Sequence, residues 1–176
     1  MPRETLDTSE PQCRRRIGSL AQAIGRALVE RGLTLAVAES CTGGLLAAHI
    51  TSIAGSSAYF VGGVVAYSDD VKRQVLGVPA KVLERYSATS AETALAMARG
   101  VRLLLHADLA LATTGLAGPT GAMPGKPVGL VYVALASVQG EQYRKYLWSG
   151  DRHENQEWSA NAALEWLQEH LSESGA

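Results

Sequence analysis

The sequence has little cysteine, almost no net charge and no long apolar run, and each shortage excludes a class of protein. Two cysteines, Cys13 and Cys41, cannot form the framework of a disulfide-rich secreted domain, so a reducing cytoplasm is the simpler expectation. A formal net charge of −1 gives no electrostatic reason to expect nucleic acid or an anionic membrane as a partner. No apolar run approaches the roughly 20 residues that a membrane-spanning helix needs. What remains is an ordinary globular composition, with 47% apolar and 19% charged residues.

The first thirteen residues differ in character from the rest. Residues 1–13 are polar and include Pro2 and Pro11, so we expect a flexible N-terminal arm. Residues 14–172 contain no internal repeat, and their length suits one hydrophobic core. The sequence therefore predicts an arm followed by a single domain.

Hydrophobic periodicity predicts helices alternating with strands. Apolar residues from Ile17 to Leu28 recur at helical spacing, and Gly32 is a stop signal. The predicted strands cover residues 33–38, 60–67, 108–114, 128–138 and 143–148. Strands separated by helices and followed by a terminal hairpin predict an α/β fold, a three-layer αβα sandwich with a mixed, mostly parallel sheet of about five strands.

Three of the predicted helices begin with capping signals. Ser68 is followed by two aspartates, which suit the positive end of a helix. Thr89 and Glu92 have the spacing of a capping box, and Asp151 precedes the last helix.

The stretch from Ala36 to Ala48 is the most informative part of the chain. A buried strand ends there, small and hydroxylated residues follow, and a helical pattern begins. Such a turn directs free backbone N–H groups and the positive helix end at one spot, which suits a phosphate, a carboxylate or an oxyanion. Ser40 and Cys41 lie side by side in this turn as candidate nucleophiles. An ordinary capped helix start contains the same residue types, so the turn alone leaves both interpretations open.

Polar residues also follow the other predicted parallel strands. The three clusters are residues 39–42, residues 67–68 and residues 113–115. In open α/β sheets, sites form beyond the carboxyl ends of the strands, so we expect these clusters to converge. Lys72 lies in the first turn of a helix, where the dipole disfavours its charged form. On spacing alone, a solvated helix lysine is the better interpretation.

Six short motifs, taken together and in order, resemble the CinA C-terminal domain family. The motifs are Ala38-Glu-Ser-Cys-Thr-Gly-Gly44, Ala54-Gly-Ser-Ser57, Tyr67-Ser68 with Lys72, Gly115-Leu-Ala-Gly-Pro119, Lys126-Pro-Val-Gly129 and Gly150-Asp-Arg152. The similarity runs from about residue 17 to about residue 170. It implies a three-layer αβα fold that is often a homodimer and is sometimes fused behind a molybdopterin-binding-like domain.

The resemblance also implies a reaction. Family members with known activity are nicotinamide-nucleotide amidohydrolases, which convert nicotinamide mononucleotide to nicotinate mononucleotide and ammonia in pyridine nucleotide salvage. It implies Ser40 as the nucleophile, Lys72 as the base and Tyr67 as a group that donates to or orients the pair. Cys41 is the rival nucleophile, although packing under the turn is the favoured interpretation. We expect no cofactor and no metal, because no His/Cys/Asp/Glu cluster has ligand spacing.

The same resemblance indicates where the nucleotide binds. N–H groups of the turn are expected to form part of the oxyanion site, the glycine-rich loop 115–121 to bring N–H groups to the phosphate, and Arg152 to pair with it. The residues expected to bind substrate are Cys41, Thr42, Gly43, Gly44, Thr114, Gly115, Gly118 and Arg152.

Two other functions are open: a non-catalytic nucleotide-binding or regulatory domain, and a Ser/Lys hydrolase of another small amide. Gln156 favours the first, because the family usually has a basic residue at this position. None of the four histidines suits the role of base. His49, His106, His153 and His170 are each expected to be solvated or packed.

Overall fold

A computed structural model describes residues 10–173, with side chains from residue 17 onward. Helix α1 (Glu10–Arg31) begins inside the segment expected to be a flexible arm. The rest of that arm, residues 1–9, lies outside the described residues. Helix α1 ends directly before Gly32, whose φ of 63° fits the predicted stop signal.

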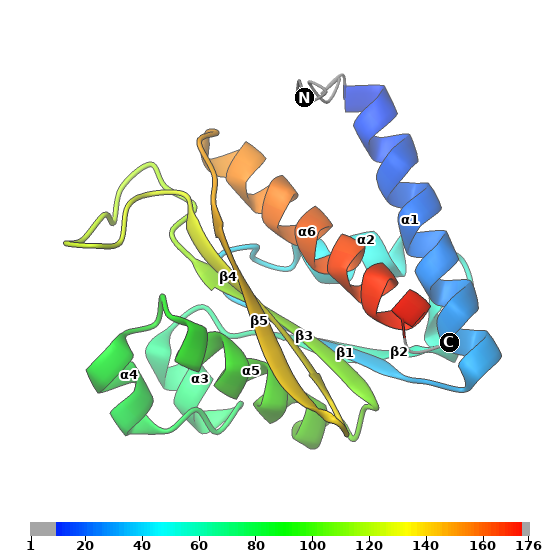
Figure 1. Ribbon diagram of the computed structural model, residues 1–176, viewed down its shortest axis with the longest axis horizontal. Helices are drawn as coiled ribbons and strands as arrows, with labels where there is room; N and C mark the ends of the chain where they lie inside the picture. The colour runs from blue at the N-terminus through cyan, green and yellow to red at the C-terminus, as the bar shows by residue number, and fades with distance from the viewer. Residues whose placement is uncertain (1–9, 174–176) are drawn as a thin grey trace.

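A mixed five-stranded sheet forms the middle of the molecule (Figure 1). Its strands are β1 (Leu35–Glu39), β2 (Phe60–Val65), β3 (Leu109–Gly115), β4 (Leu130–Ser137) and β5 (Gly140–Leu147). The spatial order is β2-β1-β3-β4-β5. Strand β1 pairs in parallel with β2 and β3, whereas β3 with β4 and β4 with β5 are antiparallel pairs. The predicted mixed sheet is confirmed, with parallel and antiparallel pairs in equal number.

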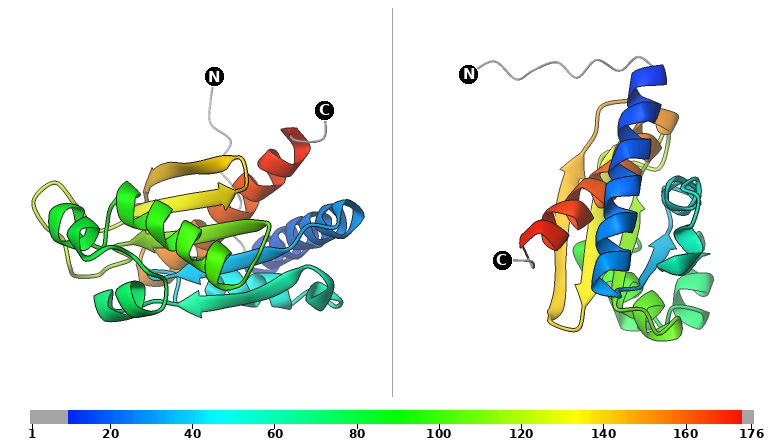
Figure 2. Two further views of the ribbon diagram at one scale, coloured as in Figure 1. Left: turned by 90° about the horizontal axis from the view of Figure 1, so that it is seen from below. Right: turned by 90° about the vertical axis from the view of Figure 1, so that its right-hand side faces the viewer.

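Helices cover both faces of the sheet and form the predicted three-layer sandwich (Figure 1). One layer holds α1, α2 (Leu45–Thr51) and α6 (Arg152–Glu173), and the other holds α3 (Asp69–Gln74), α4 (Ala80–Tyr86) and α5 (Ala91–Leu104). A short 3-10 turn, η1 (Ser56–Ala58), precedes β2. Seen from below, α5 lies in front of the sheet (Figure 2).

Large and small apolar side chains alternate along the central strands. On β1, Leu35 and Val37 belong to the core under α1 and α6, while Ala36 and Ala38 belong to the core under α5. Strands β3 and β4 follow the same alternation, because successive side chains of a strand point to opposite faces. The face covered by α5 is therefore lined largely by alanine, which lets that helix pack close to the sheet.

Close packing on this face also depends on Gly100, within α5. A Cβ at this position would lie 2.0 Å from the carbonyl oxygen of Leu76, two residues beyond the end of α3. No side chain fits in that space without displacing the backbone of Leu76. Helix α3 is thus joined to α5 by a contact that only glycine permits.

Two of the three predicted helix caps are confirmed. Ser68 Oγ accepts a hydrogen bond from the Val71 N–H at 3.3 Å at the start of α3. At the start of α6, Asp151 Oδ1 accepts from the Glu154 N–H at 2.9 Å, and Glu154 Oε2 accepts from the Asp151 N–H at 2.8 Å. This reciprocal pair is a capping box.

The third predicted cap is wrong by one residue. Helix α5 is capped by Ser90, whose Oγ accepts from the Thr93 N–H at 3.2 Å. The predicted pair, Thr89 and Glu92, matched the spacing of a capping box, but the chain enters the helix one position later. Thr89 therefore does not cap α5.

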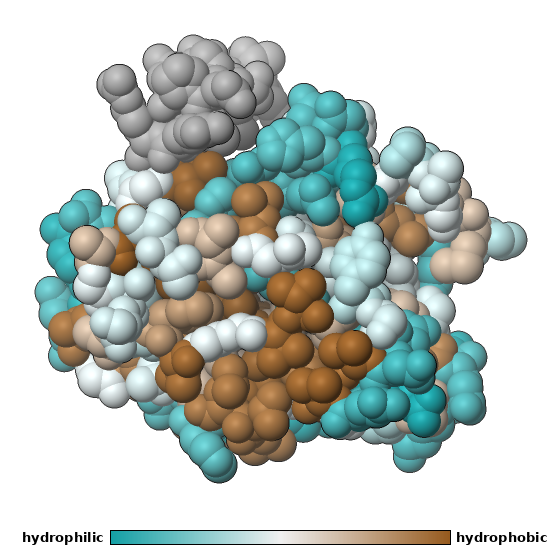
Figure 3. All heavy atoms as spheres, turned by 180° about the vertical axis from the view of Figure 1, so that it is seen from behind, coloured by the Kyte–Doolittle hydropathy of each residue, from teal (hydrophilic) through white to brown (hydrophobic). Residues whose placement is uncertain are grey.

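Apolar side chains are exposed on strand β2, which is an edge of the sheet. Val61 and Val65 on this strand are each about half exposed. Figure 3 shows an apolar area on the back of the molecule, the side on which β2 lies. The homodimer expected from the sequence stays a prediction, and this edge offers exposed apolar surface for it. Among the described residues, no helix is both long and apolar enough to cross a membrane.

Candidate active site

A cavity of about 340 Å³ lies at the carboxyl ends of β1 and β3, where the sequence predicted that polar clusters converge. Its volume is in the range of small-molecule sites. A larger hollow of about 740 Å³ is more open and is lined by residues of α1 and α6. The residues lining the smaller cavity are Ser40, Cys41, Tyr67, Asp69, Lys72, Ala88, Thr89, Thr114, Gly115, Leu116, Ala117, Gly118, Thr120 and Arg152.

Ser40 follows β1 directly and is fixed by its backbone. Its N–H donates to the carbonyl oxygen of Thr113 on β3 at 2.9 Å. The residue is 8% exposed and lines the cavity, and no residue of the described chain hydrogen-bonds its hydroxyl. Ser40 does not contact Lys72 through a hydrogen bond, but both line the same cavity, and catalytic hydrogen bonds often form only with substrate.

Lys72 is a buried lysine, only 1% exposed. Its Nζ donates to the Tyr67 carbonyl oxygen at 3.2 Å and lies 3.6 Å from Asp69 Oδ1. Burial lowers the pKa of Lys72 below its usual value, and the Asp69 carboxylate partly opposes this. The sequence attributed the lower pKa to the positive end of the helix, with partial burial as an additional cause. Burial is the larger cause in the structure, and α3 has only six residues, so that Lys72 also lies in its last turn.

Tyr67 and Arg152 meet at the exposed side of the cavity. Arg152, the first residue of α6, donates to the Tyr67 hydroxyl at 2.8 Å and to the Gly118 carbonyl oxygen at 2.6 Å. Tyr67 is 60% exposed. It therefore contacts Lys72 through its backbone carbonyl, whereas its hydroxyl bonds the guanidinium group.

Cys41 lines the cavity beside Ser40 but is buried. Burial raises the pKa of Cys41 to about 12, although N–H groups of the turn and the charge of Lys72 act in the opposite direction. The thiol therefore stays protonated near neutral pH. A thiol in this state is a weak nucleophile, so the geometry favours Ser40.

The N–H groups at the start of α2 are occupied by Glu39, which sequence reasoning overlooked as a ligand of the turn. Glu39 Oε2 accepts from the N–H groups of Gly44 at 3.0 Å and Leu46 at 3.1 Å, and Oε1 accepts from Ala47 at 2.8 Å. The prediction that these groups are free for a substrate anion is wrong. The seven-residue helix α2 already has its anion, a carboxylate from the preceding strand.

Thr42, Gly43 and Gly44, predicted to bind substrate, do not line the cavity. The Thr42 hydroxyl bonds Glu39 Oε2 at 2.6 Å and Thr113 Oγ1 at 2.7 Å. The Gly43 N–H donates to the Ser40 carbonyl oxygen at 3.2 Å. The φ angles of Gly43 and Gly44, 64° and 106°, belong to the left-handed region that favours glycine. These three residues shape the turn.

The glycine-rich loop after β3 supplies the opposite wall. Thr114, Gly115 and Gly118 all line the cavity. The Thr114 hydroxyl donates to the Ala88 carbonyl oxygen at 2.7 Å, which joins β3 to the segment before α5. This arrangement agrees with the predicted position of the loop, while its role in binding phosphate stays a prediction.

Two polar residues of α6 connect the loops around the cavity, and sequence reasoning missed both roles. Asn155 is 1% exposed, and its Nδ2 donates to the carbonyl oxygens of Ala117 and Gly150, each at 3.0 Å. Gln156 Nε2 donates to the Cys41 carbonyl oxygen at 2.8 Å. Gln156 is absent from the cavity lining, and through this bond it supports the turn that holds Ser40. The sequence shows only that Asn155 and Ser159 are spaced i and i+4 on α6, and their burial became known from the fold.

The described histidines lie away from the cavity, as predicted. His49 on α2 bonds Glu157 on α6 at 3.1 Å. Across residues 10–173, no group of three or more His, Cys, Asp or Glu side chains is arranged to hold a metal ion.

A model of the CinA C-terminal domain family matches residues 17–171. The chain belongs to this family. It is 52% identical over 143 residues to a putative competence-damage inducible protein of Desulforudis audaxviator, covering 81% of this chain and 35% of that protein. It is 50% identical over 149 residues to a CinA-like protein of Geobacter sulfurreducens, covering 85% and 36%. The chain thus spans about a third of the length of the curated relatives it matches.

Solved structures show the same fold. A competence-damaged protein (CinA) superfamily protein of Klebsiella pneumoniae has a TM-score of 0.86 at 36% identity, covering 89% of this chain and 98% of that one. A competence/damage inducible protein of Agrobacterium tumefaciens has a TM-score of 0.85 at 40% identity, covering 89% and 95%. These structures contain a CinA domain of nearly the same extent as residues 17–171.

Proposed function

We propose that this CinA domain is a nicotinamide-nucleotide amidohydrolase, which converts nicotinamide mononucleotide and water to nicotinate mononucleotide and ammonia. The observation that carries the proposal is a buried lysine that shares a small cavity with an unpaired serine hydroxyl. The relatives' names record competence and damage induction and no reaction. Support therefore comes from the chemistry of the cavity and from the family resemblance.

The geometry supports a two-step acyl transfer. Neutral Lys72 takes the proton of Ser40 as the serine oxygen attacks the carboxamide carbon, and the carbonyl oxygen becomes an oxyanion. When the C–N bond breaks, Lys72 returns the proton to the departing nitrogen, which leaves as ammonia. Water then attacks the resulting ester, Lys72 takes a proton from that water, and Ser40 leaves with a proton. The product is a carboxylate, and the residues regain their first protonation states as one proton is released.

Lys72 is suited to this work because burial lowers its pKa, so that its neutral form is accessible nearer neutral pH than for a free lysine. Asp69 beside it favours the protonated form needed to donate to ammonia. At the exposed side of the cavity, the Arg152 guanidinium offers the charge complement of a phosphate. The ring carboxamide then points inward, toward Ser40.

Ammonia release from nicotinamide mononucleotide, nicotinamide riboside and nicotinamide tests the proposal. Wild-type protein should release ammonia fastest from the nucleotide, and Ser40→Ala should reduce the rate to background while the fold persists by circular dichroism. Lys72→Arg should also fail, because a guanidinium group cannot act as a base. The matched control is Cys41→Ser, which should retain most of the activity.

The contrary outcomes identify the alternatives. An inactive Cys41→Ser beside an active Ser40→Ala would make this a thiol amidase. Nucleotide binding in calorimetry with no ammonia release would indicate a regulatory domain. Ammonia release only from other small amides would leave a Ser/Lys hydrolase of different specificity.

A further inference from the structure

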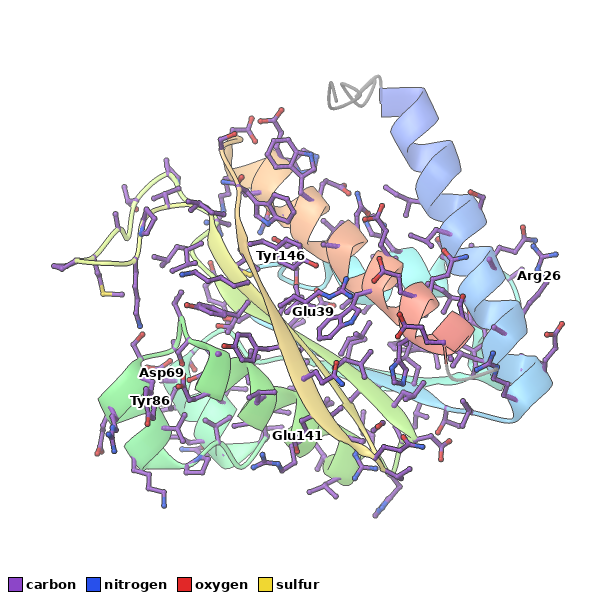
Figure 4. The ribbon with its side chains drawn as sticks, in the orientation of Figure 1. Arg26, Glu39, Asp69, Tyr86, Glu141 and Tyr146 are labelled. Atoms are coloured by element: carbon purple, nitrogen blue, oxygen red, sulfur yellow. The ribbon has the colours of Figure 1, made fainter. Side chains whose placement is uncertain are left out.

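The carboxylate of Glu39 is enclosed directly beside the candidate nucleophile. Glu39 is 1% exposed, and Figure 4 shows it near the centre of the molecule. It accepts four hydrogen bonds, one from the Thr42 hydroxyl and three from backbone N–H groups of α2 and its N-cap. A buried carboxylate is costly unless its oxygens are satisfied in this way.

Helix α2 is capped in a different way from two other helices of the chain. Helices α3 and α5 are capped locally by the serine that precedes each of them. The N-cap of α2 is Gly44, which has no side chain that could cap the helix. The free N–H groups at the start of α2 donate instead to Glu39, the last residue of β1. The hydrogen bonds of Glu39 therefore connect the end of β1 to the start of α2, and Ser40 lies in the turn between these two elements.

The same carboxylate is connected to the neighbouring strand. Thr42 Oγ1 bonds both Glu39 and Thr113 Oγ1, and the Thr113 carbonyl oxygen accepts from the Ser40 N–H. Thr113 is fully buried on β3. The turn is therefore held to β3 at Ser40 itself and at Thr42, two residues later, which limits the movement of Ser40 relative to β3.

We propose that Glu39 is a positioning residue for Ser40, which it acts on by capping α2 from the end of β1 and so fixing the turn at residues 40–43. The expected effect of Glu39 on the rate of ammonia release rests on the proposed amidohydrolase function. Glu39 also occupies the positive end of α2, so the anionic part of a substrate binds on the Arg152 side of the cavity. A nucleophile misplaced by about 1 Å loses on the order of 10²-fold in rate.

Glu39→Gln tests the inference with the least change in shape. An amide has one acceptor oxygen, so its NH₂ must face either the Ala47 N–H or the group of donors that meet at Oε2. We expect kcat for ammonia release to fall by about 10²-fold with KM nearly unchanged, because the substrate-binding wall is intact. Assays run well below the melting temperature separate this effect from loss of stability.

The matched control is Asp108→Asn, at the opposite end of the sheet. Asp108 Oδ2 accepts from the Thr34 N–H at 2.8 Å and the Thr34 hydroxyl at 2.6 Å. An asparagine amide oxygen can keep both bonds, so this substitution removes the negative charge of a hydrogen-bonded carboxylate without removing its acceptor. This variant should keep kcat. An equal fall of kcat in both variants would overturn the positioning role.

Labelling of Ser40 by a fluorophosphonate, followed by mass spectrometry, tests Glu39 without relying on the natural substrate. Glu39→Gln should be labelled about 10²-fold more slowly than wild type, and Asp108→Asn at the wild-type rate. If no pyridine nucleotide is hydrolysed, the proposed function fails while this comparison still decides the role of Glu39. Equal labelling of wild type and Glu39→Gln, or no labelling of wild type, overturns the inference.

A second pair of variants applies if Glu39→Gln does not fold. Thr42→Val removes the hydroxyl that joins Glu39 to Thr113 and leaves the three backbone bonds of the cap in place. Ser40 labelling should slow in Thr42→Val and recover in Thr42→Ser, which restores the hydroxyl. A Thr42→Val protein labelled at the wild-type rate contradicts the inference.

Discussion

Cys41 and Lys72 both line the cavity, and burial makes both favour their neutral forms. It raises the pKa of the Cys41 thiol to about 12 and lowers the pKa of the Lys72 amine. Loss of hydration disfavours the charged form of any group, so burial raises the pKa of a thiol and lowers the pKa of an amine. The result is an inert thiol next to an available amine. This contrast supports the proposal that Ser40, and not Cys41, is the nucleophile.

The pH dependence of turnover should report Lys72. Because its pKa is lowered from the ordinary value of 10.5, kcat/KM should rise with pH through an ionisation below that value, as the amine loses its proton. The unfolded chain binds more protons at Lys72 than the folded chain in the window between the lowered pKa and 10.5. The contribution of Lys72 to stability therefore rises with pH across that window.

Steady-state rates and urea unfolding, each measured from pH 6 to pH 10, check this prediction. In Lys72→Met the rising limb of activity should vanish, and the same pH-dependent part of the stability should vanish with it. A midpoint at the ordinary lysine value would show that the amine is not desolvated in solution.

Arg152 should matter for the phosphate more than for the ring. A charge-assisted contact contributes about 1.5–3 kcal/mol, so Arg152→Ala should lower kcat/KM on the nucleotide by roughly 10- to 100-fold and change riboside hydrolysis little. The control is Arg73→Ala, an exposed residue of α3 that pairs with Asp70. Competition kinetics with both substrates measure the ratio. Equal losses on nucleotide and riboside would show that Arg152 does not bind phosphate.

At the scale of helices and strands, local patterns predicted the elements, and contacts distant in sequence decided the site. Alternation and helical spacing were enough for the five strands and for α1, α5 and α6. The capping box at Asp151 involves residues three apart, and its spacing is visible in the sequence. The cap of α2 spans five to eight residues across a turn. Nothing in the sequence of a strand shows that the side chain of its last residue, Glu39, accepts hydrogen bonds from the N–H groups of the next helix.

The same limit applies to the loops around the cavity. Asn155 reaches Ala117, which is 38 residues away, and Gln156 reaches Cys41, which is 115 residues away. Such contacts depend on how α6 lies across the sheet, and periodicity carries no information about that. The chemistry of Ser40 and Lys72 was predicted from the family resemblance, whereas their burial required the fold.

The capping box of α6 gives a prediction for a whole element. Asp151→Ala removes an acceptor for the Glu154 N–H and should lower the free energy of unfolding by about 1 kcal/mol. For a chain of this size that corresponds to a fall in Tm of about 2–4 °C. Asp151→Ser retains a capping oxygen and should stay near wild type. Differential scanning calorimetry on the three proteins checks the order, and equal Tm values for all three contradict it.

For the whole molecule, charge decides which partners to expect. The relatives are named for competence and damage induction, which invites a search for contact with DNA. A net charge of −1 and a pI near 6.4 argue against it, because non-specific binding to a duplex is driven by the release of counterions by lysine and arginine.

We therefore expect no binding of this chain to duplex DNA. Fluorescence anisotropy of a labelled 30-base-pair duplex should stay flat on titration with protein at low salt, where electrostatic binding is strongest. A basic DNA-binding protein serves as the positive control. A rise in anisotropy that disappears with added salt would contradict the expectation.

The glycine within α5 has a consequence for redesign of this domain. Helix propensity favours alanine over glycine by about 1 kcal/mol in a helix interior, so a procedure that scores α5 alone would replace Gly100. The Leu76 carbonyl occupies the place of the new methyl group, and yielding would move α3 together with Lys72. A substitution outside the cavity lining would thus change the distance between Lys72 and Ser40. A search for stability that replaces Gly100 would therefore disturb the candidate active site.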